Sequence, residues 1–254
     1  MFRFYPNYIM INIFLLFFLL ISSVFCNEQN TQSQKNNWTK NLNKLTIIEN
    51  SNTSKIDCPY GIGCECTDDK DCINSNCEKH FRAGYTCTLQ NGDTFPHFIS
   101  KDQFDELVDI YDFAGQDKYI LIEMGATWCS PCNLLAGWFA YGEEDIKTKP
   151  FWKDEYNRIY DLVKNEEIIF ITILYENEFK DTATFDTVYE WYSTYPDELI
   201  PILYDGEKLL HKLIKPTGIP AITLVDKNMK ILNISTRGFN QSFDKLLELI
   251  DNEK

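Results

Sequence analysis

Two cysteines near the middle of the chain have the spacing that thiol–disulfide chemistry requires. Residues 125–135 read GATWCSPCNLL, so that two residues separate Cys129 from Cys132. A thiolate that attacks a disulfide needs a second thiol nearby to resolve the mixed disulfide, and a Cys-x-x-Cys pair supplies both groups. The same spacing also occurs in one half of a zinc site and in ordinary structural disulfides. The residues around the pair must therefore distinguish a redox pair from half of a zinc site and from a structural disulfide.

The elements around the pair favour the redox interpretation. An apolar stretch, YILIEM at residues 119–124, predicts a strand before the pair, and a predicted helix begins at Cys129. At a helix N-terminus the dipole and the unpaired N–H groups lower the pKa of Cys129, while Cys132 lies nearly one turn later and more deeply buried. Pro131 is tolerated in a first helical turn. No second cysteine or histidine pair follows closely, and so short a disulfide loop adds little stability.

The charge balance excludes some partners. The 254 residues include 38 acidic and 24 basic ones, which gives a formal net charge of −14, and 44 % of residues are hydrophobic. A chain this acidic, without a basic cluster, is a poor candidate for binding nucleic acid or an anionic membrane surface. The hydrophobic content is sufficient for a sizeable buried core.

The first 57 residues predict export and a linker. Residues 1–26 combine Arg3, an apolar run and a small-residue cut site after Cys26, which is the layout of a secretory signal peptide. An uncleaved membrane anchor, or a lipid on Cys26, remains the alternative. In each case the body of the protein is expected to be extracytoplasmic: periplasmic, secreted or surface-tethered. Residues 27–57 are polar and predict a disordered linker.

A cysteine-rich segment follows at residues 58–87. Its six cysteines are Cys58, Cys64, Cys66, Cys72, Cys77 and Cys87. In an exported chain an even number at this density predicts a small module held by structural disulfides. Six cysteines allow fifteen pairings, and the sequence does not choose among them. A metal site and a redox relay to the downstream pair stay open as alternatives.

Residues 88–254 alternate between strand and helix patterns. Strands are predicted at 119–124, 168–175, 200–205, 218–226 and 230–236, and a short hairpin at 89–95. Helices are predicted at 101–111 with Ser100 as N-cap, from Cys129 onward, and at 152–164, 182–195, 208–214 and 242–251. This order predicts an α/β fold, a central mixed sheet with helices on both faces, behind the disulfide-rich module.

Two motifs together resemble the thioredoxin superfamily. WCSPC follows an apolar strand, and GIP at residues 218–220 opens another strand, GIPAITLVD. The additional strand and helix at residues 176–215 resemble the TlpA-like or redoxin branch of thiol–disulfide oxidoreductases. The resemblance covers residues 88–254 and implies a thioredoxin-like fold. The cysteine-rich segment has no counterpart in that pattern.

The resemblance implies roles for five residues. Cys129 matches the nucleophilic cysteine and Cys132 the resolving one, while Trp128 matches the aromatic residue that flanks the pair. Pro220 matches a proline that faces the cysteines and follows a cis peptide bond. Ile219 would then offer its backbone to an extended substrate, as in strand addition.

Glu123 is a further candidate because it interrupts an apolar strand shortly before the pair. Thioredoxin carries a buried aspartate at the corresponding position, so the resemblance implies a proton-transfer role. A buried carboxyl group has a raised pKa and can exchange a proton with the resolving thiol. The alternative is a surface orientation, although Tyr119, Leu121 and Glu123 share one face of the strand.

Other candidate residues carry weaker signals. His80, His97 and His211 have no metal-ligand spacing. An aromatic set in the predicted helix at 182–195 is interpreted as packing rather than as a partner surface; it consists of Phe185, Tyr189, Trp191, Tyr192 and Tyr195.

The sequence therefore predicts an exported protein disulfide oxidoreductase. Its substrates would be disulfide-containing proteins, and it would need a separate electron donor or acceptor but no cofactor and no metal. Contact with a membrane is expected only if the N-terminal segment is retained. Ser130-Pro131 between the cysteines and Ile219 before the proline favour a reductant, by resemblance. Two alternatives remain: a non-catalytic binding or adhesion module with a permanently oxidised pair, and a peroxidase-like redoxin that uses Thr127.

Overall fold

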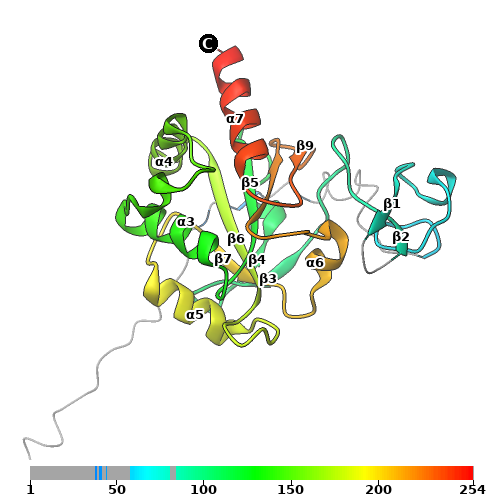
Figure 1. Ribbon diagram of the computed structural model, residues 1–254, viewed down its shortest axis with the longest axis horizontal. Coiled ribbons are helices and arrows are strands. Elements are labelled where there is room, and N and C mark those ends of the chain that lie inside the picture. Colours follow the sequence, from blue (N-terminus) through cyan, green and yellow to red (C-terminus); the bar gives the residue numbers. More distant parts are fainter. Residues whose placement is uncertain (1–37, 39, 42–43, 45–57, 81–83, 254) are drawn as a thin grey trace, which may run out of the picture. The chain divides into compact units, whose positions relative to one another are not determined.

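A five-stranded mixed sheet forms the centre of the structure, a computed structural model that describes residues 38, 40–41, 44, 58–80 and 84–253 (Figure 1). Its strand order is β7-β6-β5-β8-β9. The strands are β5 (Ile120–Ala126), β6 (Ile169–Glu176), β7 (Ile202–Tyr204), β8 (Ala221–Val225) and β9 (Ile231–Ile234). β5, β6 and β7 run parallel, while β8 is antiparallel to both β5 and β9. The predicted central mixed sheet is confirmed.

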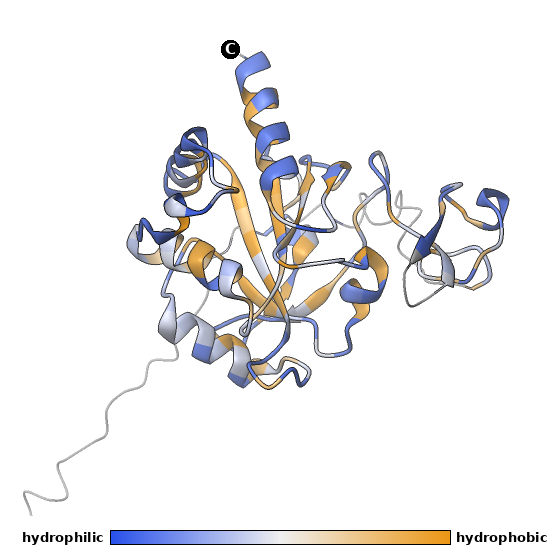
Figure 2. Ribbon diagram, in the orientation of Figure 1, coloured by the Kyte–Doolittle hydropathy of each residue, from blue (hydrophilic) through white to orange (hydrophobic). Residues whose placement is uncertain are grey.

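Apolar side chains of β5 belong in turn to two core clusters, one on each face of the sheet. Figure 2 shows the ribbon of the central strands coloured mostly hydrophobic. Every residue of β5 is buried, as expected for a central strand with both faces covered. Ile120 and Ile122 pack with residues of α6 (Leu209–Ile214) and of the segment 89–114. Leu121 packs on the other side. The helices of that side are α3 (Ser130–Tyr141), α4 (Asn157–Lys164), α5 (Phe185–Thr194) and α7 (Asn240–Asn252).

The helices agree with the predicted ranges except at their ends. The predicted helix at 152–164 is a short 3-10 turn, η4 (Asp154–Tyr156), followed by α4. A further 3-10 turn, η3 (Asp145–Thr148), follows α3. Thr184 caps α5 through a capping box with Thr187, which explains why the helix begins later than residue 182. Gly142, at φ +70°, ends α3 in the left-handed conformation that glycine adopts at little cost.

The helix predicted at 101–111 is wrong. That segment forms a hairpin of β3 (Ile99–Lys101) and β4 (Leu107–Asp109), followed by the 3-10 turn η2 (Ile110–Phe113). The buried carboxylate of Asp102 accepts hydrogen bonds from the backbone N–H groups of Phe104 and Glu106, at 2.9 and 3.0 Å. Ser100 caps no helix, because its hydroxyl donates to the Tyr204 carbonyl at 2.7 Å. The Asp102 carboxylate thus accepts backbone N–H groups that carbonyl oxygens would accept in a helix.

The hairpin predicted at 89–95 is also wrong, although its turn is present. Gly92 adopts φ +93° beside Asn91, as an Asn-Gly turn requires. The two arms do not pair with each other. The N–H groups of Gly92 and Phe95 instead donate to the carbonyls of Ile231 and Met229, at 2.8 and 2.7 Å. The segment therefore lies along β9.

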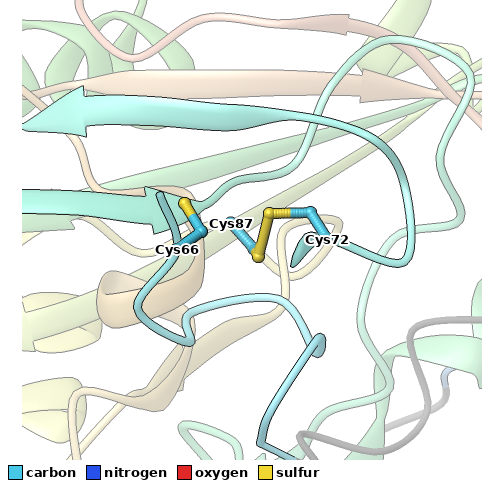
Figure 3. Close-up of side chains that lie close together, drawn as sticks. All are labelled: Cys66, Cys72 and Cys87. Atoms are coloured by element: carbon cyan, nitrogen blue, oxygen red, sulfur yellow. A yellow bond between two sulfur atoms is a disulfide. The ribbon is translucent and has the colours of Figure 1, made fainter. Parts of the chain in front are cut away.

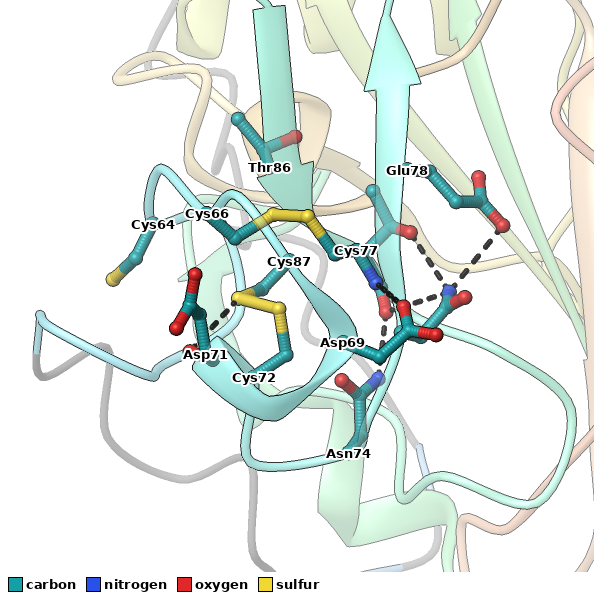
Figure 4. Close-up of a disulfide and its surroundings, with 12 residues drawn as sticks. Cys64, Cys66, Asp69, Asp71, Cys72, Asn74, Cys77, Glu78, Thr86 and Cys87 are labelled. Carbon is teal, nitrogen blue, oxygen red and sulfur yellow. Dashed lines mark hydrogen bonds between the residues drawn. A yellow bond between two sulfur atoms is a disulfide. The ribbon is translucent and has the colours of Figure 1, made fainter.

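The cysteine-rich segment contains three disulfides, and Figure 4 draws two of them, Cys66–Cys77 and Cys72–Cys87. They join Cys58 to Cys64, Cys66 to Cys77 and Cys72 to Cys87. The segment also holds a 3-10 turn, η1 (Asp69–Asp71), and a two-stranded sheet of β1 (Cys77–His80) and β2 (Gly84–Cys87). The carboxylate of Asp69 accepts the N–H of Cys77 at 2.9 Å.

Side chains of this segment also contact the main sheet domain. Ile62 is buried in the core cluster that contains Leu213 of α6. The Asn74 amide donates to the Thr88 carbonyl and to the Asp93 carboxylate, both at 2.6 Å. The ammonium group of Lys215 is hydrogen-bonded to the Thr86 hydroxyl. Core packing and polar contacts thus cross the boundary predicted at residue 87.

The predicted signal peptide at residues 1–26 lies outside the described residues. In the predicted linker, residues 38, 40, 41 and 44 are described. The Trp38 indole N–H donates to the Asp102 carboxylate at 2.9 Å, and Lys44 contacts Asp109 and Asp112 at 2.9 and 2.6 Å. These four residues therefore include side chains that contact the main sheet domain. Within the described part of the chain, no helix is long and apolar enough to cross a bilayer.

Candidate active site

The two central cysteines lie where β5 turns into α3. Cys129 is the N-cap of α3, and its sulfur accepts the N–H of Cys132 at 3.2 Å. Pro131 occupies the first turn, where a missing N–H removes no helical bond. The two sulfurs form a disulfide, and the exposed fractions of Cys129 and Cys132 are 2 % and 0 %. The structure thus represents the oxidised state of the pair.

Polar contacts fix the turn that carries the pair. The Asn133 amide donates to the carbonyls of Thr127 and Cys129, at 2.9 and 2.8 Å. The Asn133 side-chain oxygen in turn accepts the hydroxyl of Tyr195 at 3.0 Å. In the reduced state, the N–H groups and dipole of the α3 N-terminus would face the Cys129 sulfur and favour its thiolate.

Glu123 is buried inside the sheet, with an exposed fraction of 2 %. One carboxyl oxygen accepts the Thr172 hydroxyl at 3.0 Å, and the other has no hydrogen-bond partner. Burial raises the pKa of Glu123 to about 7, although the hydrogen bond from Thr172 opposes the shift. A carboxyl group with this pKa can both hold and release a proton near neutral pH.

Glu123 and Cys132 meet around Gly125. A methyl group on Gly125 would lie 3.4 Å from the unpartnered oxygen of Glu123 and 3.6 Å from the sulfur of Cys132. The Glu123 carboxyl oxygen and the Cys132 sulfur therefore both lie close to the same point beside Gly125. A cavity of about 20 Å³ adjoins Glu123, and its lining includes Thr172, Tyr195 and Asp197. That volume is enough for one water molecule, which could exchange protons with the carboxyl group.

Trp128 is partly exposed directly before the pair, with an exposed fraction of 40 %. Its indole N–H donates to the Glu176 carboxylate at 2.9 Å. The ammonium group of Lys208 binds the other oxygen of Glu176 at 2.5 Å. A second cation, Lys180, lies 5.4 Å from the centre of a Trp128 ring. The Trp128 indole is thus bound through its N–H by Glu176, and the ammonium group of Lys180 lies over its ring.

Ile219 and Pro220 directly precede β8. Ile219 is partly buried and packs against the cluster that contains Cys129 and Cys132. The peptide bond between Ile219 and Pro220 is cis, as the resemblance implied. The Pro220 carbonyl accepts the N–H of Gly238 at 2.6 Å. The substrate-positioning roles of Trp128 and Ile219 remain predictions.

Sequence reasoning missed four residues of this site. Thr172, Glu176, Lys180 and Arg237 were not singled out. Thr172 had a signal, because it is the polar residue inside the apolar strand 168–175 and pairs with Glu123 across β5 and β6. Lys180 and Arg237 lie on loops, where no periodicity indicates which residues face the site.

The described histidine side chains make structural contacts. His97 contacts the Asp109 carboxylate at 2.8 Å. His211 lies against the Tyr175 ring, with 4.4 Å between centroids, and burial lowers its pKa. In the aromatic set of α5, Trp191 is buried, in line with the packing interpretation, whereas Tyr189 is 56 % exposed.

One group of potential metal ligands occurs among the described residues. The sulfurs of Cys66, Cys72 and Cys87 lie within 4.8 Å of one another and are buried (Figure 3). All three are disulfide-bonded, and metal ligation requires thiolates. In this oxidised state the residues do not fit a metal.

Comparisons with known proteins point to one superfamily. No family model matches the chain. The chain is similar to Thioredoxin-1 of Saccharomyces cerevisiae, with 28 % identity over 87 residues that cover 34 % of this chain and 79 % of that protein. The resemblance to the thioredoxin superfamily is thus confirmed.

Solved structures with a similar fold carry related names. One, from Chlorobium tepidum, is named as a thiol:disulfide interchange protein DsbE, with 18 % identity, a TM-score of 0.46 and coverage of 64 % of this chain and 96 % of that one. Another is the thioredoxin domain of a thiol-disulfide oxidoreductase from Bacteroides vulgatus, with 18 % identity, a TM-score of 0.44 and coverage of 65 % and 98 %. The central mixed sheet with α3 following β5 is consistent with a thioredoxin-like fold.

Proposed function

We propose that this thioredoxin-like chain is an exported thiol–disulfide oxidoreductase that acts on protein disulfides, with Cys129 and Cys132 as its redox pair. The observation that carries the proposal is the buried carboxyl group of Glu123, which meets the sulfur of Cys132 around Gly125. A purely structural disulfide has no use for an ionisable group there, since burying an unpaired carboxylate costs free energy.

The reaction begins with the reduced pair. The Cys129 thiolate attacks one sulfur of a substrate disulfide, and the other substrate sulfur leaves as a thiolate. The Cys132 thiolate then attacks the Cys129 sulfur of the mixed disulfide and displaces the second substrate sulfur. The substrate gains two electrons and two protons, and the chain is left with the Cys129–Cys132 disulfide.

Glu123 moves a proton in the second step. Cys132 must lose its proton before it can attack, and a buried thiol resists ionisation. The carboxylate form of Glu123 accepts that proton, and the neutral form returns it when the pair is reduced again. A pKa of about 7 makes both directions accessible at neutral pH.

The surfaces beside the pair position the substrate. The backbone of Ile219 would pair with an extended substrate chain next to its cystine, and the indole of Trp128 would contact it from the side of Cys129. No cofactor takes part. A separate thiol or dithiol donor must reduce the pair after each turnover in the reductive direction.

Export and direction belong to the same proposal. The apolar stretch in residues 1–26 supports an extracytoplasmic location. The Ser-Pro dipeptide between the cysteines and the Ile219–Pro220 motif support a reductant. We assign the three disulfides of residues 58–87 a structural role, because the cysteines are fully paired with one another.

The first test is the reduction potential of the pair, measured by equilibrating the full chain with defined dithiol buffers and trapping free thiols. A reduction potential of about −270 mV supports a reductant, and a reduction potential of about −120 mV supports an oxidant. A Cys129→Ser variant should lose all reduction of a cystine-containing protein. A pair that is reduced only when the chain unfolds would contradict the enzyme and favour the non-catalytic binding module.

A further inference from the structure

Two loops of an otherwise acidic chain each carry a cation that lies next to a residue adjoining the proposed site in sequence. The formal net charge is −14, yet Lys180 and Arg237 lie next to Trp128 and Gly218 respectively. Both side chains are exposed, and neither has a carboxylate within ion-pair distance among the described residues. We call these two residues the cationic rim.

The loop that carries Lys180 is held rigidly. The Asn177 side-chain oxygen accepts the N–H groups of Phe179 and Asp181, each at 2.9 Å, and the Asn177 N–H donates to the Asp181 carbonyl. Lys180 has φ +67°, a left-handed conformation that non-glycine residues rarely adopt. In this conformation, the ammonium group of Lys180 lies 5.4 Å from the centre of a Trp128 ring.

Arg237 is held against the substrate-binding loop. A methyl group on Gly218 would lie 3.1 to 3.2 Å from Cγ, Cδ and Nε of Arg237, so the absence of a side chain at Gly218 gives the arginine its place. The Ser235 hydroxyl donates to the Arg237 and Gly238 carbonyls, at 2.9 and 3.1 Å. The Arg237 side chain therefore lies against Gly218, the residue that directly precedes Ile219 in the sequence.

The chain segment of Lys180 carries carboxylates of its own, whereas the segment of Arg237 carries none. Glu176 is bound by Lys208 and by the Trp128 indole, so its charge is already compensated. Glu178 and Asp181 are exposed neighbours of Lys180 along the chain. The loop around Arg237, residues 235–239, and the segment Thr217–Pro220 contain no carboxylate.

An exposed aromatic residue completes this surface. Phe179 precedes Lys180 and is 76 % exposed, which is unusual for a large apolar side chain. Trp128 contributes a second partly exposed ring at 40 %. A substrate segment that passes Trp128 can bury apolar surface here while its charges meet the rim.

We infer that the preferred substrates are protein segments with carboxylates beside their cystine. This inference rests on the proposed function and adds the substrate class. Arg237 and Lys180 pair with Asp or Glu residues of the substrate chain while its backbone lies along Ile219. Complementary charges of this kind raise the association rate and discriminate against basic segments.

The test uses three synthetic peptides, each closed by one disulfide, that differ only in Asp, Ser or Lys next to the cysteines. The kcat/KM for their reduction by the full chain is measured at 0.1 M salt, with dithiothreitol as electron donor and its background rate subtracted. We expect the Asp peptide to exceed the Lys peptide by about tenfold. Arg237→Glu should remove or reverse that preference.

The control variant is Lys227→Glu, which changes the net charge equally. Lys227 follows β8 at the end of the sheet remote from the pair, because Val225 pairs with Ile120 at the start of β5. It should keep the wild-type preference. A small uncharged substrate, hydroxyethyl disulfide, should be reduced equally well by wild type and by Lys227→Glu.

Equal rates for the three peptides, with hydroxyethyl disulfide still reduced, would overturn the substrate class and leave the proposed function in place. Failure to reduce any disulfide, the small one included, would overturn the proposed function and this inference with it. Equal losses of preference in Arg237→Glu and Lys227→Glu would show an effect of net charge. That result would contradict substrate selection by the cationic rim.

Discussion

At the scale of single residues, Glu123 is the group in which the proposed redox role and the stability of the fold conflict. One of its oxygens has no hydrogen-bond partner, and burial raises its pKa to about 7 from an ordinary value of 4.5. The folded state therefore binds a proton that the unfolded state releases between those two values. The folded chain must bury a charge whenever the proton leaves, which costs free energy.

This conflict predicts a pH dependence of stability. Because the carboxyl pKa is higher in the folded state, the free energy of unfolding falls as pH rises from about 4.5 through about 7. The shift corresponds to about 3 kcal/mol. Glu123→Gln stays neutral, so its free energy of unfolding relative to wild type should rise by about 1–3 kcal/mol between pH 5 and pH 8. Urea unfolding at both pH values measures this difference.

An exposed glutamate serves as the control for this prediction. Glu178→Gln should leave the wild-type pH dependence unchanged, because that side chain is exposed. An identical pH dependence in Glu123→Gln and wild type would contradict the raised pKa. The same Gln variant should also accumulate mixed disulfide with substrate, since the second step loses its proton acceptor.

The residues of the site could be predicted from the sequence where a local motif carried them. The cysteine pair, Glu123 and the cis peptide bond before Pro220 follow from short patterns that a single segment contains. Thr172 required the register of β5 against β6, and Arg237 required the contact with Gly218. Such contacts join segments far apart in the chain, and no local pattern determines them.

At the scale of elements, the hairpin of β3 and β4 shows how one side chain can override helical periodicity. The segment 101–111 has the apolar spacing of a helix, but Asp102 accepts two backbone N–H groups that a helix would have used. The hydroxyl of Ser100 donates a hydrogen bond to the Tyr204 carbonyl. The strands and the helices after residue 119 were predicted correctly, because their apolar patterns and their packing agree.

The Asp102 carboxylate should therefore be needed for the hairpin. Asp102→Ala leaves the N–H groups of Phe104 and Glu106 without their acceptor and removes the partner of the Trp38 indole. We expect the free energy of unfolding to fall by about 2–4 kcal/mol. Asp105→Asn in the same turn removes only an exposed ion pair with Lys101 and should cost less than about 1 kcal/mol. Equal losses in both variants would contradict this account.

At the scale of the whole molecule, the cysteine-rich segment depends on long-range pairing that the sequence left open. Fifteen pairings were possible, and the three observed ones close loops with sequence separations of 6, 11 and 15. Each pairing needs the fold to bring two Cα atoms within about 7 Å. Composition predicts that such a segment is cross-linked, but only the packed structure selects the partners.

Loop length predicts how much each disulfide stabilises the chain. Removing the bond of Cys72 and Cys87, with a separation of 15, should lower the free energy of unfolding by about 3 kcal/mol. Removing the bond of Cys58 and Cys64, with a separation of 6, should lower it by about 2 kcal/mol. Paired Cys→Ser variants measured by thermal unfolding compare the two. A larger loss from the shorter loop would mean that packing, rather than chain entropy, sets the effect.

The polar segment before the cysteine-rich module also adds to the stability of the whole chain. Lys44 contacts Asp109 and Asp112, whose side chains are 8 % and 7 % exposed. Burial lowers the pKa of Lys44, but the hydrogen bonds from its ammonium group to Asp112 and Asp109 raise it by more, so the net shift is upward. A raised lysine pKa means that the stabilisation is fully present below about pH 10.5 and is lost as pH rises through the folded value.

Lys44→Met should therefore destabilise the chain by about 1–3 kcal/mol, because two nearly buried carboxylates lose their cation. The difference from wild type should stay constant between pH 6 and pH 9, since the ammonium group stays protonated over that range. Guanidinium unfolding at several pH values measures it. Lys40→Met is the matched control, because Lys40 is exposed in the same segment and should cost less than about 0.5 kcal/mol. If Lys44→Met costs no more than Lys40→Met, the contacts of Lys44 do not stabilise the fold, and the segment before residue 58 contributes through Trp38 instead.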